Sequence, residues 1–152
     1  MNIEDYLRSL DVAFEVKHHA TSFTAQREAA AQHISGKQFA KTVVVKTGDR
    51  HTLLVLPAAR HVDLQRVGEL LGGPAVLAEE REMAELFPGC DVGAEPPFGS
   101  RYGLPTLVDR TLAAQPTIAV RAGSHTEVLL LAWADYQRLE QPEIADFSLS
   151  GG

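Results

Sequence analysis

Residues 91–99 constrain the fold of this chain more than any other segment, because their backbone can follow few paths. The sequence there is Asp-Val-Gly-Ala-Glu-Pro-Pro-Phe-Gly. Gly93 and Gly99 permit backbone angles that other residues resist, and the two prolines fix φ between them. The segment is either a long surface loop or a shaped loop that presents its backbone N–H groups to a ligand. Long loops without secondary structure of their own are often functional, so we expect the second.

A valine-rich segment about fifty residues earlier carries a lysine at each end. Lys41 precedes the run Thr-Val-Val-Val, and Lys46 follows it. A lysine that bounds a buried strand is often only a solvated strand end. Alternatively, the strand fixes its Cα atom, and the ammonium group reaches into a pocket as a point charge for phosphate or carboxylate. Because side chains alternate along a strand, only one of the two lysines can face a given pocket, and we predict Lys41.

Helical periodicity, strand alternation and capping residues predict a mixture of short elements. The expected helices span residues 3–10, 25–31 (after an N-cap at Thr24), 64–71 (after an N-cap at Asp63), 79–87 and 133–139. The expected strands span residues 13–17, 41–47, 52–57, 107–109, 117–121 and 127–131. Gly48 and Asp49 suit the tight turn of a hairpin. This mixture favours an α+β fold, a mixed β-sheet flanked by helices, over a doubly wound parallel sheet.

Length and composition indicate one globular domain over residues 1–152, since the sequence contains no repeat and no low-complexity linker. The one cysteine, Cys90, excludes an intrachain disulfide and fits a reducing compartment, so we expect a cytoplasmic protein. We expect neither a signal peptide nor a membrane partner, because no segment has the required apolar run. The formal net charge of −6 argues against broad coating of nucleic acid, but it allows a local basic pocket for one nucleotide end.

The familiar catalytic arrangements do not appear in the sequence. Ser124 and His125 are adjacent, and neighbouring side chains on an extended chain point to opposite sides, so they do not form a serine–base pair. The segment of Gly123, Ser124 and His125 is instead expected to form a turn that can still touch a ligand. Cys90 is expected to be a small buried group rather than a nucleophile. The histidines show no metal-ligand spacing, so we expect neither a metal nor another cofactor.

Taken in order, several segments resemble the YbaK family, which includes the editing domain inserted in bacterial prolyl-tRNA synthetases. The matching segments are residues 40–45, 63–64, 92–99, 104–109 and 122–128, followed by the expected helix at Trp133. Each motif is modest alone, but the ordered set covers nearly the whole chain. The length suits a freestanding member of that family.

This resemblance implies a curled mixed sheet flanked by helices and a trans-acting aminoacyl-tRNA deacylase. Such proteins hydrolyse the ester that joins a wrong, small amino acid to the terminal adenosine of a tRNA. The resemblance implies that Lys41 binds the terminal nucleotide or the aminoacyl group. It also implies that Gly93 and Ala94 place backbone amides near the ester carbonyl. The further residues expected to contact the substrate are Pro96, Pro97, Phe98, Gly99, Gly123, Ser124 and His125.

Family mechanisms use water and a tRNA hydroxyl rather than an enzyme nucleophile, so positioning and oxyanion stabilisation by amides would carry the catalysis. The expected partner is the acceptor end of a tRNA, held by a local patch of Lys41, Lys37 and Arg101, with a transient synthetase contact. Two alternatives remain open: a non-catalytic module that binds a nucleotide or a tRNA end, and a regulatory protein that has kept the fold without the activity. The amino acid removed and the oligomeric state are left open by the sequence.

Overall fold

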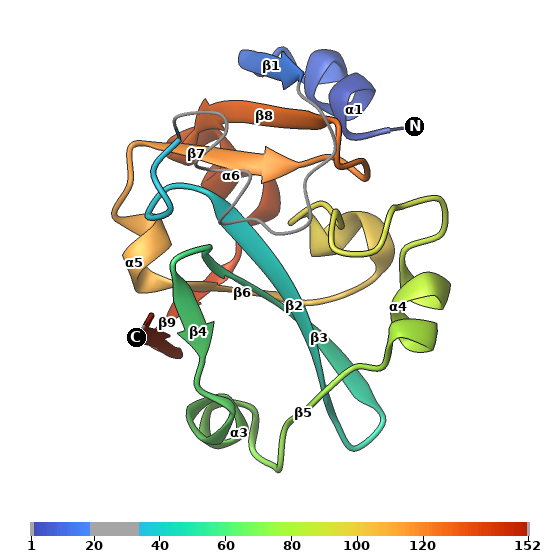
Figure 1. The fold of residues 1–152 in the computed structure, drawn as a ribbon, viewed down its shortest axis with the longest axis vertical. Coiled ribbons are helices and arrows are strands. Elements are labelled where there is room, and N and C mark those ends of the chain that lie inside the picture. Colours follow the sequence, from blue (N-terminus) through green and yellow to red (C-terminus); the bar gives the residue numbers. More distant parts are fainter. Residues whose placement is uncertain (1, 19–33, 152) are drawn as a thin grey trace.

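The computed structural model describes residues 2–18 and 34–151 (Figure 1). The helix expected over residues 25–31, with its cap at Thr24, lies outside these ranges. The chain begins with helix α1 (Ile3–Ser9), for which the Asn2 side chain accepts a hydrogen bond from the Asp5 N–H at 2.8 Å. Strand β1 (Phe14–His18) follows. No helix in the described ranges is long and apolar enough to cross a membrane.

A five-stranded mixed sheet forms the centre of the molecule. Its strands, in spatial order, are β5 (Val76–Leu77), β2 (Ala40–Thr47), β3 (Arg50–Pro57), β6 (Thr106–Asp109) and β9 (Glu143–Ala145). Strands β2 and β3 form an antiparallel hairpin, while β6 pairs parallel with β3 and β9 parallel with β6. The hairpin turns at Gly48, whose φ of +59° lies in the region that favours glycine.

A second, three-stranded sheet lies across the start of β2 (Figure 1). It is antiparallel and runs in the order β1, β8 (Glu127–Ala132), β7 (Thr117–Arg121). A parallel bridge between Phe39 and Ala119 connects the two sheets, with the Ala119 N–H donating to the Gln38 carbonyl at 3.0 Å. The combined strands curl without closing in the described residues. A two-stranded ribbon of β4 (Arg60–Val62) and β10 (Ser148–Ser150) completes the β-structure.

Short helices surround these sheets (Figure 1). They are α3 (Leu64–Leu71), α4 (Glu80–Leu86), the 3₁₀-helix η1 (Gly99–Tyr102), α5 (Arg110–Ala113) and α6 (Trp133–Glu140). Helix α3 shows the predicted boundaries, since the Asp63 side chain accepts from the Arg66 N–H at 3.2 Å and Gly72 ends the helix with a φ of +82°. The predicted α+β class is therefore confirmed.

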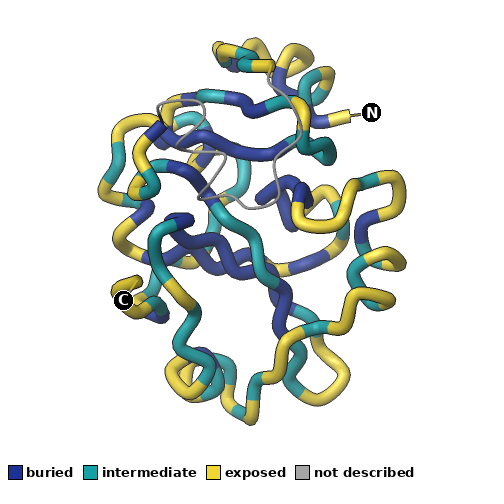
Figure 2. The backbone as a smooth tube through the Cα atoms, in the orientation of Figure 1, coloured by how far each residue is buried: buried dark blue, intermediate teal, exposed yellow. Residues whose placement is uncertain are grey.

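Strand β3 has a nearly continuous apolar sequence because the core covers both of its faces. Residues 52–57 of this strand are all buried (Figure 2). Leu53 and Val55 pack into one hydrophobic cluster, while Leu54 and Leu56 pack into another on the opposite face. A central strand covered on both faces needs apolar residues at every position. The sequence analysis missed β4, β5, β9, β10 and α5, because pairing with distant strands, rather than a local pattern, defines elements of two to four residues.

One prediction concerns Tyr136 on α6, which is fully buried and donates a hydrogen bond from its hydroxyl to the Pro97 carbonyl at 2.5 Å. Tyr136→Phe leaves that carbonyl buried without its partner, so the free energy of unfolding is expected to fall by about 1–3 kcal/mol. Urea unfolding measures this change.

Tyr6→Phe is the matched control, because the Tyr6 hydroxyl makes no hydrogen bond within the described part of the chain. Its stability is expected to stay within about 0.5 kcal/mol of the wild type. Equal losses in the two variants would contradict a special role for the Tyr136 hydroxyl.

Candidate functional site

The loop of residues 91–99 is mostly a buried segment rather than a surface connection. Residues 91–93 are exposed, whereas residues 94–99 are buried. Gly93 has a φ of +85°, which turns the chain from the exposed part into the buried part. A buried loop must satisfy its backbone polar groups without water. The contacts of the loop therefore show how it is held in place.

Glu95 fills the centre of this loop, and the sequence analysis did not select it. Its residue is only 5% exposed, and its carboxylate accepts the Gly93 N–H at 2.8 Å and 3.2 Å through its two oxygens. Burial raises the pKa of the Glu95 carboxyl, and hydrogen bonds from the backbone amides of residues 93–95 act in the opposite direction. Successive backbone amides form a concave site that suits an anion. In this loop, the Glu95 carboxylate occupies that position.

Ala94 connects the loop to the turn between β7 and β8. Its N–H donates to the Asp91 carbonyl at 3.0 Å, and its carbonyl accepts from the Gly123 N–H at 2.9 Å. The Asp91 N–H in turn donates to the Gly123 carbonyl at 2.8 Å. Two segments about thirty residues apart in the sequence thus lie side by side. Neither the Gly93 amide nor the Ala94 amide is free in this structure.

His125 strengthens the same junction. Its ring Nε2–H donates to the Val92 carbonyl at 2.6 Å, and its backbone N–H donates to an Asp91 carboxylate oxygen at 3.3 Å. The ring also limits residue 93, because a Cβ atom there would lie 3.5 Å from His125 Cε1. Ser124 shares a hydrogen bond of 2.7 Å with the Thr126 hydroxyl. This contact matches the turn that the sequence predicted in preference to a serine–histidine pair.

Cys90 lies beside the junction as a small, half-buried group. A Cβ atom at Gly123, where φ is +100°, would meet its sulfur at 3.4 Å, and its sulfur lies 3.7 Å from the Tyr102 hydroxyl. Burial raises the pKa of the Cys90 thiol, which disfavours the nucleophilic thiolate. A cavity of about 470 Å³ borders Cys90, Tyr102, Gly123 and Ser124. The turn thus borders a cavity together with Cys90, the residue just before the loop.

Lys41 lies at the start of β2, next to the residue that holds the loop. The Thr42 hydroxyl donates to the Glu95 carbonyl at 3.2 Å, so β2 and the loop are in contact. The Lys41 ammonium group is turned away by strand alternation and donates to the Arg60 carbonyl of β4. Burial lowers the pKa of Lys41. Lys46 faces a different region, where its ammonium group lies 3.8 Å from a Glu82 carboxylate oxygen.

Pro96, Pro97, Phe98 and Gly99 hold the loop against the core. The Phe98 ring is fully buried, with its centroid 5.2 Å from that of Tyr136. Gly99 lies against β6 and the residue before it, because a Cβ atom there would be 2.3 Å from the Thr106 hydroxyl oxygen and 2.7 Å from the Leu104 carbonyl oxygen. In this structure these four buried residues serve packing, and the exposed part of the loop is the part that can meet a ligand.

The structure separates Arg101 from Lys37, the two residues that were expected to form a basic patch with Lys41. Arg101 lies over the ring of Tyr6 at 4.2 Å from its centroid, whereas Lys37 lies near Arg60 and so near the Lys41 contact. Among the residues that the structure describes, no group of three or more histidine, cysteine, aspartate and glutamate side chains could hold a metal ion. A further cavity, of about 890 Å³, lies at the far end of the central hairpin and borders none of the predicted site residues.

Residues 19–139 match the family model described as the aminoacyl-tRNA editing domain. The chain is 36% identical over 116 residues to the multifunctional Ser/Thr-tRNA deacylase ProXp-y of Escherichia coli K12, which covers 72% of this chain and 69% of that relative. A solved structure of a candidate trans-editing enzyme for prolyl-tRNA synthetase has a TM-score of 0.80 and 25% identity, covering 90% of this chain and 87% of that one. These matches confirm the resemblance and the enzyme class that the sequence indicated.

A further solved structure, a hypothetical protein, has a TM-score of 0.87 with 22% identity and covers 97% of this chain and 99% of its own. At that identity the likeness concerns the fold alone. It agrees with the α+β class and with the curl of the two sheets.

Gly99→Ala tests the close approach of the loop to β6. The Leu104 carbonyl belongs to the backbone and cannot move aside easily, so the free energy of unfolding is expected to fall by about 1–3 kcal/mol. Gly73→Ala is the control, because a Cβ atom at Gly73 would meet no atom within 4 Å, and its change is expected within about 0.5 kcal/mol. Urea unfolding of both variants decides the matter, and a neutral Gly99→Ala would contradict the packing role.

Glu95→Gln tests the buried carboxylate. Because burial raises the pKa of Glu95, the folded protein holds this proton more tightly than the unfolded chain does. The stability of the wild type, relative to that of Glu95→Gln, is therefore expected to decline as pH rises from 4.5, the ordinary value, to the raised pKa.

The measurement is urea unfolding of both proteins at several pH values across that range. The neighbouring groups that titrate, namely Cys90, Asp91 and His125, are present in both proteins and largely cancel in the difference. A stability difference that does not change with pH would show that the Glu95 carboxyl has no raised pKa.

Proposed function

Since the chain belongs to the aminoacyl-tRNA editing domain family, we propose that it is an aminoacyl-tRNA deacylase that acts in trans in the cytoplasm. It hydrolyses the ester of a tRNA that carries a small, wrongly attached amino acid, and so maintains the fidelity of translation. The match over residues 19–139 carries this conclusion. Serine and threonine are the first amino acids to test, because the relative from Escherichia coli is a Ser/Thr-tRNA deacylase.

The proposed chemistry is attack by water or a tRNA hydroxyl on a positioned ester, without a covalent enzyme intermediate. Two observations support this choice over an enzyme nucleophile. The Ser124 hydroxyl is engaged with Thr126, and burial raises the pKa of the Cys90 thiol. Positioning alone removes a large part of such a barrier, because it replaces a bimolecular encounter by an ordered complex.

Gly93 is the amide that we propose for the oxyanion of the reacting ester. The Ala94 N–H already donates to the Asp91 carbonyl, a contact within the loop, whereas the Gly93 N–H donates to the side chain of Glu95. A side chain can withdraw without refolding the loop. The developing negative charge of the ester would then replace the carboxylate at the same donor.

Lys41 is proposed to bind the terminal nucleotide or the aminoacyl group. Its ammonium group is half-buried and donates to the Arg60 carbonyl, and within the described residues it has no carboxylate partner. A lysine without a carboxylate partner can transfer its hydrogen bond to a phosphate or an ester carbonyl at little cost. We propose residues 1–152 as one editing unit and any synthetase contact as transient.

A second candidate function is a module that binds the tRNA end without hydrolysis. The contact between Glu95 and the Gly93 amide favours it, because the amide cannot stabilise an oxyanion as long as the Glu95 carboxylate stays in place. A panel of mischarged tRNAs, incubated with protein at catalytic concentration, separates the two functions. Only the deacylase releases free amino acid over many turnovers.

Lys41→Ala tests the proposed site within that panel. Loss of the ammonium group is expected to lower kcat/KM by about 100-fold while the urea midpoint stays near that of the wild type. Lys46→Ala is the matched control at the other end of β2, since Lys46 pairs with Glu82, and its kcat/KM is expected to stay within about twofold. Near-normal turnover by Lys41→Ala would remove this lysine from the site.

A further inference from the structure

Lys37, Lys41 and Arg60 lie near one another, and in the part of the chain that the structure describes none of them has a carboxylate partner. Within the described residues, Lys37, Lys41 and Arg60 form no ion pair, although the chain has a net charge of −6. Most other basic residues do form such pairs, and these are Arg8, Lys17, Lys46, Arg66, Arg81, Arg110 and Arg138. Cations left uncompensated in an acidic protein attract an anion from outside.

A cavity of about 280 Å³ is lined by two of these residues, Lys37 and Arg60. The rest of its described lining consists of the polar residues Thr111, Gln115 and Ser150 and the apolar or small residues Pro57, Ala59 and Gly151, and none of them is acidic. The buried carboxylate of Asp109 lies next to the cavity, where it accepts from the N–H of the lining residue Thr111 at 3.1 Å, from the Phe147 N–H at 2.9 Å and from Ser148. In the described part of the chain it forms no ion pair with Lys37 or Arg60. The volume is just under the roughly 300 Å³ at which small-molecule sites begin, so the cavity suits a small group such as one phosphate.

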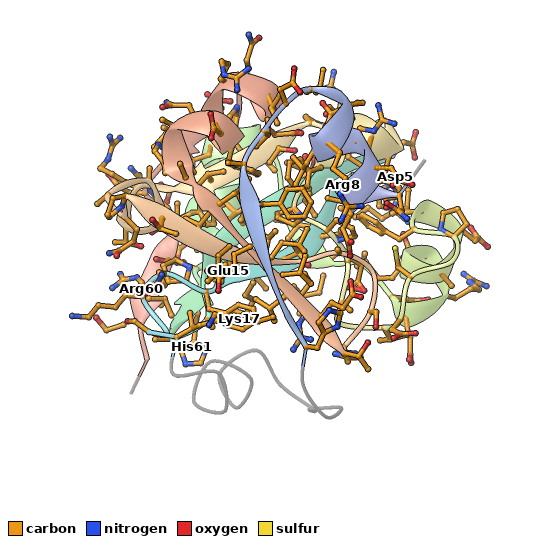
Figure 3. The ribbon with its side chains drawn as sticks, turned by 90° about the horizontal axis from the view of Figure 1, so that it is seen from above. Asp5, Arg8, Glu15, Lys17, Arg60 and His61 are labelled. Atoms are coloured by element: carbon orange, nitrogen blue, oxygen red, sulfur yellow. The ribbon has the colours of Figure 1, made fainter. Side chains whose placement is uncertain are left out.

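The guanidinium group of Arg60 is already oriented for this role. Its Nε–H donates to the Ser148 hydroxyl at 2.6 Å, and its Nη2 donates to the Ser148 carbonyl at 3.1 Å. These two bonds fix the plane of the group and leave the other donors, including both on Nη1, for a ligand. In Figure 3, Arg60 and His61 lie at one edge of the molecule, away from Arg8 and Asp5. Lys37, the other basic residue that lines the cavity, is exposed, so the site is reached from outside.

We propose that the cavity between Lys37 and Arg60 binds a backbone phosphate of the tRNA acceptor strand. This inference rests on the proposed function, because Lys41, whose ammonium group contacts the Arg60 carbonyl, would hold the terminal nucleotide next to it. Arginine and lysine together suit a phosphodiester, since the first supplies a planar pair of donors and the second a mobile point charge. The two residues thus bind the strand next to Lys41, which would hold the terminal nucleotide, while the loop acts on the ester.

The experiment compares two substrates with and without phosphates. Seryl-tRNA, or the most active member of the panel above, is set against 3′-O-seryl-adenosine, which has no phosphate. Lys37→Gln and Arg60→Gln are each expected to raise KM for the tRNA about tenfold and to reduce the salt slope of kcat/KM by about 0.7. Both variants are expected to hydrolyse the adenosine ester as the wild type does.

Arg138→Gln is the control, because Arg138 lies on α6 and pairs with Asp135 at 3.1 Å. Lys37 is exposed and its side chain makes no described contact, so Lys37→Gln keeps the test valid if Arg60→Gln fails to fold. A Lys37→Gln variant that behaves like the control on tRNA would overturn the proposal. Equal losses on both substrates would also overturn it, because they would place the residue at the ester.

A binding experiment separates this inference from the proposed function. If the wild type hydrolyses no member of the panel, the proposed function fails, and binding of the 5′-phosphorylated trinucleotide CCA then tests the cavity alone. Weaker binding by Lys37→Gln than by Arg138→Gln supports the phosphate site. Equal binding by the two variants overturns it, as does displacement of the trinucleotide by inorganic phosphate at equal concentration, which would indicate a site for free anions.

Discussion

The alternation of side chains at the start of β2 organises the candidate site. Successive residues of a strand face opposite sides, so Thr42 and Lys41 serve two different regions. The Thr42 hydroxyl holds the Glu95 carbonyl of the loop, and the Lys41 ammonium group contacts the Arg60 carbonyl of β4. One rigid strand thereby fixes the distance between the loop and the basic cavity. A one-residue shift of β2 in its pairing with β3 would exchange the two faces.

The buried loop depends on complete pairing of its backbone. The Pro97 carbonyl accepts from Tyr136, the Glu95 carbonyl from Thr42, and the Ala94 carbonyl from Gly123. These partners come from α6, β2 and the turn after β7, so three separate parts of the fold must be in place. The loop is thus a product of the whole architecture, although its glycines and prolines make it possible.

The sequence predicted elements whose signals are local. Asp63 and Gly72 mark the two ends of α3, and Gly48 marks the turn of the central hairpin, because capping and turn residues act on their own neighbours. Glu95 and Arg60 were missed because their roles come from distant partners. A carboxylate within a loop of small and apolar residues was the one available signal for Glu95. No sequence pattern near Arg60 predicts its contact with Ser148, which lies 88 residues away.

The uneven distribution of charge has a consequence for the encounter with RNA. Most basic groups outside the cavity are neutralised by neighbouring acids, and the molecule as a whole is negative. If RNA binds as proposed, a polyanion that approaches from most directions is repelled, whereas a strand end presented to the Lys37–Arg60 edge is attracted. Electrostatic steering of this kind selects an orientation before contact.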